Sequence, residues 1–123
     1  MANGKIKADT LEHSTAGSLD TQYVVNGSAK AHASLDGATT PSLFGSFNIS
    51  GIIDSAVGDT LYNFSSAMND AVYSIAGSSN SGGATAVHVS NSTTQFRTVQ
   101  RLDSNGSTAS DTDNSSAIFG DLA

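Results

Sequence analysis

Three histidines are the first residues to consider, because imidazole nitrogens bind metals and change protonation near neutral pH. They stand at His13, His32 and His88, a spacing that matches no metal-binding motif on one chain. A three-fold axis could bring three copies of one histidine together, and His32 is the best candidate for such a site. His88 alternates with Val87 and Val89, which predicts a solvent-facing side chain. We therefore expect surface histidines and no metal.

The segment DSNGSTASDTDN, residues 103–114, is rich in oxygen ligands. Carboxylates and amides at alternating positions can bind calcium, and the candidates are Asp103, Asn105, Asp111 and Asp113. The spacing departs from a calcium loop, because Gly106 directly follows Asn105 and no later glutamate exists. We expect a flexible polar loop, with an ion site as the alternative.

The sequence gives little support for a catalytic activity. A serine nucleophile needs a base and an orienting carboxylate, and no G-x-S-x-G motif is present. Hydrolysis by two acids is disfavoured, because the sole glutamate, Glu12, lies in the N-terminal segment. No glycine-rich loop leads into a predicted helix, so a nucleotide site is not expected. We expect a non-enzymatic protein without a cofactor.

A sugar-binding platform of exposed aromatic rings is a further candidate. Period-two alternation places most of the rings on predicted core faces, namely Phe47, Tyr62, Phe64, Tyr73 and Phe96. Only Tyr23 and Phe44 fall outside these faces, and tryptophan is absent. A carbohydrate-binding adhesin module therefore stays as the alternative from another functional class.

The composition favours strands over helices. Ser, Thr, Asn and Gly supply 54 of the 123 residues, whereas charged residues make up 13%. Small polar residues compete with the helical backbone for hydrogen bonds, and the chain has few charges to form stabilising helical pairs. A chain of this length suits one domain with one core.

The charge distribution bears on partners. The formal net charge is −6, and no Lys or Arg occurs from residue 31 to 96. Such a chain offers no basic surface for phosphate, so we expect no nucleic-acid binding. No apolar run is long enough to cross a membrane. The absence of cysteine and of a secretory signal favours assembly in a reducing cytoplasm.

Seven apolar segments with strand period follow one another from residue 28. They span residues 28–35, 46–53, 59–68, 71–79, 84–91, 94–102 and 115–122. Turn-forming residues separate them, and Met68-Asn69-Asp70 reads as the tightest hairpin. Strands of this length without intervening helices predict antiparallel sheets in a β-sandwich or jelly-roll-like domain.

The pattern of apolar residues in residues 1–22 differs from that in the rest of the chain. Their apolar residues, Ile6, Leu11 and Leu19, are isolated among small and polar ones. Three such residues cannot offset the entropy of ordering the backbone. We expect an extended N-terminal attachment arm over residues 1–22 that becomes ordered against a partner, followed by a β-sandwich body over residues 23–123.

The first body segment carries an alanine face. Asn26-Gly27 is typical of a tight turn, and Ala29, Ala31 and Ala33 then alternate with polar residues. Alanine buries little area, so another surface must pack closely on this face, such as that of a second chain. We expect Ala29, Ala31 and Ala33 in a subunit interface.

Three segments carry a resemblance to a known family. They are KIKADTLEHSTAGSLDTQYVVNGSAKA (residues 5–31), SFNISGIIDSAVGDTLYNFSSAMNDAVYSIAG (46–77) and AIFGDLA (117–123). Together they resemble small virion structural proteins of tailed, notably marine, bacteriophages that are described as tail-fibre proteins. NGSAKA is the most specific element. The next position is often aromatic in that family, whereas this chain has His32.

The resemblance implies a structural role on a phage particle. Such appendages are usually trimers, with the N-terminal part near the attachment point and a β-rich body outward. It implies a homotrimer on the virion surface whose partners are tail, portal-proximal or capsid proteins, with a host-surface glycan as a further candidate. If His32 packs across the subunit interface, it makes that interface weaker or pH-sensitive. A capsid decoration protein is the alternative within this class.

Overall fold

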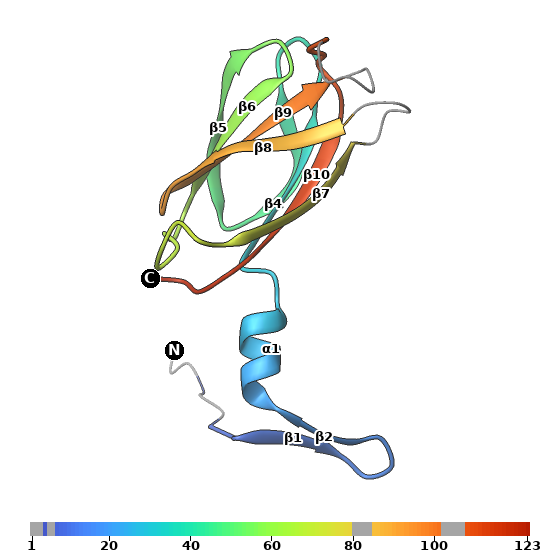
Figure 1. Ribbon diagram of the computed structural model, residues 1–123, viewed down its shortest axis with the longest axis vertical. Coiled ribbons are helices and arrows are strands. Elements are labelled where there is room, and N and C mark those ends of the chain that lie inside the picture. Colours follow the sequence, from blue (N-terminus) through green and yellow to red (C-terminus); the bar gives the residue numbers. More distant parts are fainter. Residues whose placement is uncertain (1–3, 5–6, 80–84, 102–107) are drawn as a thin grey trace.

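The body of the chain is a sandwich of two antiparallel sheets (Figure 1). The computed structural model describes residue 4 and residues 7–79, 85–101 and 108–123, with the backbone alone described over 85–91. Within these residues the body strands are β3 (Ala31–Asp36), β4 (Ser42–Phe47), β5 (Ile49–Ala56), β6 (Asp59–Phe64), β7 (Ser74–Ser79), β8 (Thr85–Asn91), β9 (Gln95–Arg101) and β10 (Asn114–Phe119). The predicted all-β sandwich is confirmed.

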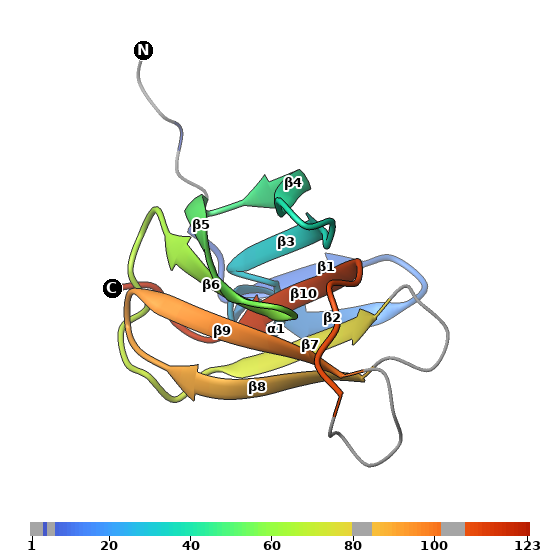
Figure 2. The same cartoon turned by 90° about the horizontal axis from the view of Figure 1, so that it is seen from above.

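One sheet has the strand order β4-β3-β10-β7 and the other has β5-β6-β9-β8 (Figure 2). Hairpins join β3 to β4, β5 to β6 and β8 to β9. The remaining connections cross from one sheet to the other, so that β10, the last strand, lies between β3 and β7. The two ends of the body are therefore adjacent in one sheet.

The predicted hairpin at Met68-Asn69-Asp70 is wrong. β6 pairs with β5 and β9, whereas β7 pairs with β10 in the opposite sheet. The segment crosses between sheets instead: Met68 is buried, Asn69 N donates to Asp121 O at 2.8 Å, and Val72 N donates to Asp70 Oδ1 at 2.8 Å. Turn-forming residues thus mark a change of sheet here, which periodicity cannot distinguish from a hairpin.

The predicted strand over residues 46–53 is divided at Asn48, whose φ of 56° reverses the chain between β4 and β5. Asparagine tolerates this conformation, and its side chain bonds locally: Ser66 N donates to Asn48 Oδ1 at 2.7 Å. The register between β5 and β6 shifts between Ile49 and Gly51, which marks a bulge. Phe47, predicted inside, is 58% exposed, because the break at Asn48 uncouples its face from that of Ile49.

Aromatic rings fill the space between the sheets. Tyr62 and Phe96 stack with centroids 4.4 Å apart, and Phe64 meets Tyr73 edge to face at 5.7 Å. The predicted core positions of these four rings are confirmed, with exposures of 8% or less. They pack with the aliphatic residues of the core, namely Ala31, Ala33, Leu35, Met68 and Ile118. Alternation therefore located the core wherever a strand stays in register.

Four consecutive residues, Asp111–Asn114, close the end of the sandwich far from the N-terminus. Gly58 N donates to Asp111 Oδ1 at 2.7 Å, and Gly37 N donates to Asp113 Oδ1 at 3.0 Å. Thr112 Oγ1 donates to Gln100 Oε1 at 3.3 Å. This segment therefore ties together the β3–β4 loop, the β5–β6 turn and β9.

The N-terminal residues form a hairpin and a helix instead of one extended arm. The hairpin joins β1 (Thr10–His13) to β2 (Gly17–Asp20), and α1 (Thr21–Gly27) follows at once. Asn26-Gly27, predicted as a tight turn, ends this helix. The helix crosses the boundary predicted after residue 22, and we call residues 7–30 the N-terminal appendage. In Figure 1 it stands apart from the sandwich.

Truncation of a core ring is the first test of the fold. Phe64→Ala should destabilise the protein by roughly 3–5 kcal/mol, because it removes buried apolar surface and leaves a cavity. Phe44→Ala is the matched control, since that ring is 66% exposed. Denaturant unfolding should separate the two variants clearly, and equal stabilities would show that the strand register is wrong.

Substitution of two glycines by alanine tests the packing at the closed end of the sandwich. A Cβ on Gly37 would overlap the backbone of Thr112, whereas a Cβ on Gly45 meets nothing within 4 Å. Gly37→Ala should therefore lower the free energy of unfolding by on the order of 1–3 kcal/mol. Gly45→Ala should change it by well under that amount. If Gly37→Ala were as stable as the wild type, residues 110–113 would not pack against the β3–β4 loop.

Candidate attachment surface

The N-terminal appendage buries none of its side chains, and only the two residues at its joints, Thr21 and Lys30, are half-buried. Its large apolar residues are 43–61% exposed, namely Leu11, Leu19, Tyr23, Val24 and Val25. We call these five residues the appendage apolar surface. Helices as short as α1 are not stable in isolation, and a two-stranded hairpin is marginal at best. The appendage therefore offers apolar area that a partner can cover.

Hydrogen bonds at Thr21 connect the first turn of the helix to the segment before β1. Thr21 N donates to Asp9 O at 2.8 Å, and Thr21 Oγ1 donates to Ala8 O at 2.7 Å. The angle between the elements leaves a shallow groove of about 420 Å³ whose apolar walls include Leu11, Val24 and Val25. Its size suits the insertion of one or two side chains from another protein.

The sequence NGSAKA, residues 26–31, forms the joint between appendage and sandwich. Ser28 N donates to Val24 O at 3.1 Å and closes the last turn of α1. The Lys30 ammonium group donates to the carbonyls of Val25 and Ser28, while Lys30 N donates to Ile118 O at 2.7 Å. Lys30 thus bonds to both parts, and Ala31 begins the buried strand β3.

The structure places two of the three predicted arm residues. Leu11 and Leu19 are directly opposite each other on β1 and β2, so both lie on one face of the hairpin. Ile6 lies outside the described residues. Tyr23, Val24 and Val25 were not among the predicted arm residues, because the helix that presents them begins at the predicted boundary.

The predicted interface residues Ala31 and Ala33 do not form a free face. They are 0% and 2% exposed and pack against the aromatic core of the same chain, so the prediction that another chain covers them is wrong. The physical need was correctly identified: small side chains require a close neighbour, and the opposite sheet provides it. Ala29 is exposed in the joint, and His32 is exposed on the outer side of β3.

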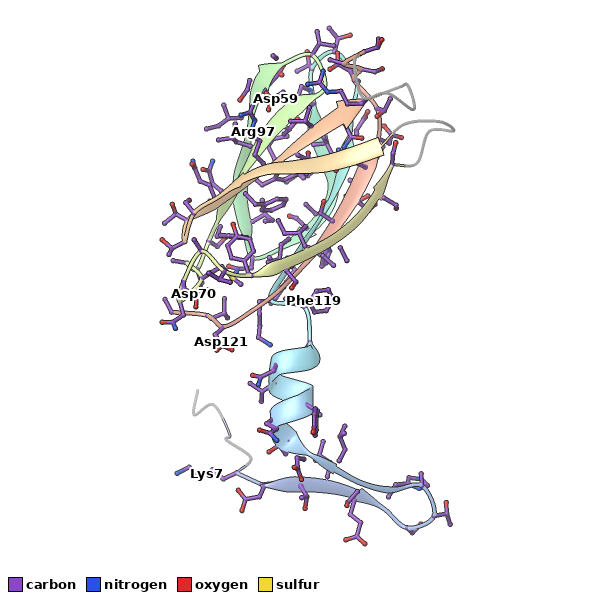
Figure 3. All side chains as sticks on the ribbon, in the orientation of Figure 1. Lys7, Asp59, Asp70, Arg97, Phe119 and Asp121 are labelled. Atoms are coloured by element: carbon purple, nitrogen blue, oxygen red, sulfur yellow. The ribbon has the colours of Figure 1, made fainter. Side chains whose placement is uncertain are left out.

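The outer side of the β4-β3-β10-β7 sheet has a hollow beside a projecting ring. The hollow has a volume of about 440 Å³ and is lined chiefly by Ser34, Ser115, Ser78, Ala76 and Ala117. At its border His32 and Phe47 stack with ring centroids 6.4 Å apart. Figure 3 places Phe119, on β10, at the end of this sheet next to the joint.

We call this outer side the neutral face, because its four strands contain one charged residue, Asp36, at the far end of β3. The exposure of Phe47 was missed by the sequence analysis. The one available signal was the polar Asn48 immediately before Ile49, a residue type that permits a left-handed turn.

The outer side of the other sheet combines polar pairs with an apolar residue, Ile53, which is 48% exposed. Arg97 forms an ion pair with Asp59 on the neighbouring strand, visible in Figure 3, and its Nε donates to Asp59 Oδ1 at 2.6 Å. The hydrogen bond to Asp59 raises the pKa of the Arg97 guanidinium. Gln95 Nε2 donates to Asn63 Oδ1 at 2.5 Å alongside. These pairs satisfy each other and leave a solvated surface.

Three of the candidate metal ligands accept hydrogen bonds from backbone amides of the same chain. Asp111 and Asp113 accept backbone hydrogen bonds, while Asp103 and Asn105 lie outside the described residues. His13 Nδ1 accepts Ala16 N at 3.1 Å in the β1–β2 turn. The side chain of His88 is not described. Across the described part of the chain, no group of three His, Asp or Glu side chains could hold a metal ion.

The interior contains one polar cluster. Tyr62 OH donates to Asn114 Oδ1 at 3.1 Å, and Thr98 Oγ1 donates to Tyr62 OH at 3.4 Å. Burial raises the pKa of the Tyr62 phenol, with the hydrogen bonds to Thr98 and Asn114 acting in the opposite direction. Burial also raises the pKa of Tyr73. Both phenols are therefore neutral structural groups at physiological pH.

Comparison with protein-family models, with curated proteins and with solved structures found no match to this chain. In the described residues, no helix has the length and apolar character required to cross a membrane.

Alkaline titration tests the polar cluster. Burial raises the folded-state pKa of Tyr62 above its ordinary value of about 10, so its contribution to stability is complete below pH 10 and is lost as pH rises further. The free energy of unfolding should fall above pH 10, and Tyr62→Phe should weaken that dependence while lowering stability at pH 7. If Tyr62→Phe leaves the alkaline slope unchanged, the phenol is not buried.

Proposed function

We propose that this chain is a non-enzymatic structural protein of a bacteriophage particle, a subunit of a short trimeric tail fibre or similar appendage. The N-terminal appendage attaches it to another virion protein, and the sandwich projects outward on the virion surface. The observation that carries the proposal is the contrast between a sandwich with a closed core and an appendage that buries none of its side chains.

The exposed area supports a need for partners. The chain exposes 7487 Å² in total. A compact monomer of 12.4 kDa would expose about 6,100 Å², which is roughly 1,400 Å² less. A standard protein interface removes about 800 Å² from each partner. The chain therefore has enough surplus surface for a full interface.

The family resemblance supports the same proposal through the joint. Three residues of NGSAKA form the joint: Gly27 is the last residue of the helix, Ser28 N closes its last turn, and Lys30 bonds to both parts. A defined joint fixes the direction in which the sandwich leaves its attachment point. Such a constraint suits a projecting fibre better than a freely rotating tether.

Two alternatives remain as proposals of lower rank. A capsid decoration protein would use the same appendage but bind the shell. A carbohydrate-binding adhesin would use exposed rings, and Tyr23, Phe44 and Phe47 are the exposed ones. These rings lie on two separate elements, Tyr23 on α1 and the other two on β4, which favours a structural role over a single sugar platform.

Introduction of charge into the appendage tests attachment. Leu19→Asp places a carboxylate in the centre of the appendage apolar surface, where a partner would have to desolvate it. We expect incorporation of this variant into particles to fall at least tenfold, measured by quantitative mass spectrometry of purified virions. Melting of the sandwich should be unchanged, because Leu19 contributes nothing to its core.

Ser18→Asp is the matched control. Ser18 neighbours Leu19 on β2 but points to the opposite side of the hairpin, and it pairs with Glu12. This variant should incorporate normally. Equal incorporation of Leu19→Asp and the wild type would contradict attachment through this surface. The copy number separates the alternatives: a few copies at the tail indicate a fibre, and one copy per shell subunit indicates decoration.

A further inference from the structure

We propose that the neutral face of the β4-β3-β10-β7 sheet binds a second copy of this chain, with Phe47 of one copy inserted into the hollow on its neighbour. This inference rests on the proposed trimeric function and assigns the subunit contact to the sandwich. It replaces the alanine face, which the core of the same chain covers.

Shape is the first argument. Phe47 projects from the end of the edge strand β4 with 58% of its surface exposed. The hollow of about 440 Å³ lies beside it, over β3, β10 and β7. An apolar cavity of about 150 Å³ can hold a benzene molecule, so the hollow is large enough for a phenyl ring. One face therefore carries both a projection and a complementary depression.

The chemistry of the hollow suits a ring. Ala76 and Ala117 lie opposite each other on β7 and β10, and Gly77 and the backbone of the small residues complete the floor. The hydroxyls of Ser34 and Ser115 lie 3.3 Å apart, so that one donates a hydrogen bond and the other accepts it. A phenyl ring in the hollow would pack chiefly on Ala76, Gly77 and Ala117.

Charge favours a second copy as the occupant. The chain carries a net charge of −6, so two copies repel each other over most of their surface. A contact through the neutral face desolvates few charges, because its strands contain Asp36 alone, at the end away from Phe47. The outer side of the other sheet has four charged positions on its strands, namely Asp54, Asp59, Arg97 and Arg101. Two such charged sides would have to be desolvated to meet.

Position is compatible with a closed ring. The projection lies at one edge of the sheet and the hollow extends over the other strands. Two copies can insert Phe47 into each other's hollow about a two-fold axis, whereas one-way insertion around a three-fold axis closes a ring of three. The ring is the arrangement that the proposed trimer requires. Phe119 and the joint lie at the same end, so the appendages of the copies would emerge together (Figure 3).

The experiment measures the mass of the full-length chain by light scattering and sedimentation. Wild-type protein should have about three times the monomer mass of 12.4 kDa. Phe47→Ala removes the projection, and Ala117→Glu fills the hollow with a charge; each should raise the dissociation constant at least tenfold. Phe44→Ala is the matched control, because it removes a ring of equal size, 66% exposed, from the same strand. Circular dichroism should show all variants folded.

Three outcomes would overturn the inference. One is a monomeric wild-type chain. Another is a trimer that survives Phe47→Ala and Ala117→Glu but dissociates with Leu19→Asp, which would assign assembly to the appendage. The third is a monomer whose binding to a glycan array is abolished by Phe47→Ala, which would make the hollow a sugar site. The attachment function is tested separately by the incorporation of Leu19→Asp into virions. A negative result for self-association would therefore not decide whether the appendage attaches the protein.

Discussion

Apolar burial in this protein is confined to one of its two parts. Every residue of the described core lies in the sandwich, where the stacked rings of Tyr62 and Phe96 bridge the two sheets. The sandwich can therefore fold around its own core, since burial of such rings is the dominant favourable term in folding. Apart from the bonds of Lys30 to Ile118 and Asn48, the hydrogen bonds of the appendage join its own residues. Such bonds barely exceed the hydrogen bonds to water that they replace, and no residue of the appendage belongs to the described core.

The joint connects the appendage to the sandwich through Lys30. Lys30 bonds to the end of α1 through its side chain and to β10 through its backbone. Asn48 Nδ2 donates to Lys30 O at 3.1 Å, so the turn between β4 and β5 is attached to the same residue. The position of the appendage is therefore coupled to the end of the neutral face that carries Phe47. Attachment and self-association would meet at one end of the sandwich, leaving the end closed by Asp111–Asn114 facing outward.

The sequence predicted the interior better than the surface. Alternation placed Tyr62, Phe64 and Phe96 correctly, because an apolar residue at every second position of a regular strand has only two possible directions. It failed at Phe47, where a single left-handed residue changed the sheet, and at Asp70, where turn-forming residues mark a crossing. The alanines were assigned to a subunit interface because the sequence does not reveal which surface supplies a close neighbour.

The helix was missed for a related reason. Thr21–Gly27 is short, has β-branched residues and lacks a side-chain cap, so local preferences for a helix are weak. The surfaces proposed for attachment and self-association depend on this helix and on the break at Asn48. At Asn48 the break depends on hydrogen bonds to Lys30 and Ser66, which are distant in sequence.

Hydrogen exchange of the chain, free and in intact particles, tests the central claim most directly. In the free protein, backbone amides of β6, β9 and β10 should be protected for long times, and those of β1, β2 and α1 should exchange rapidly, because no core supports them. In particles the appendage amides should become protected while the protection of the sandwich stays as it was. Appendage amides that exchange equally fast in free protein and in particles would contradict attachment through the appendage.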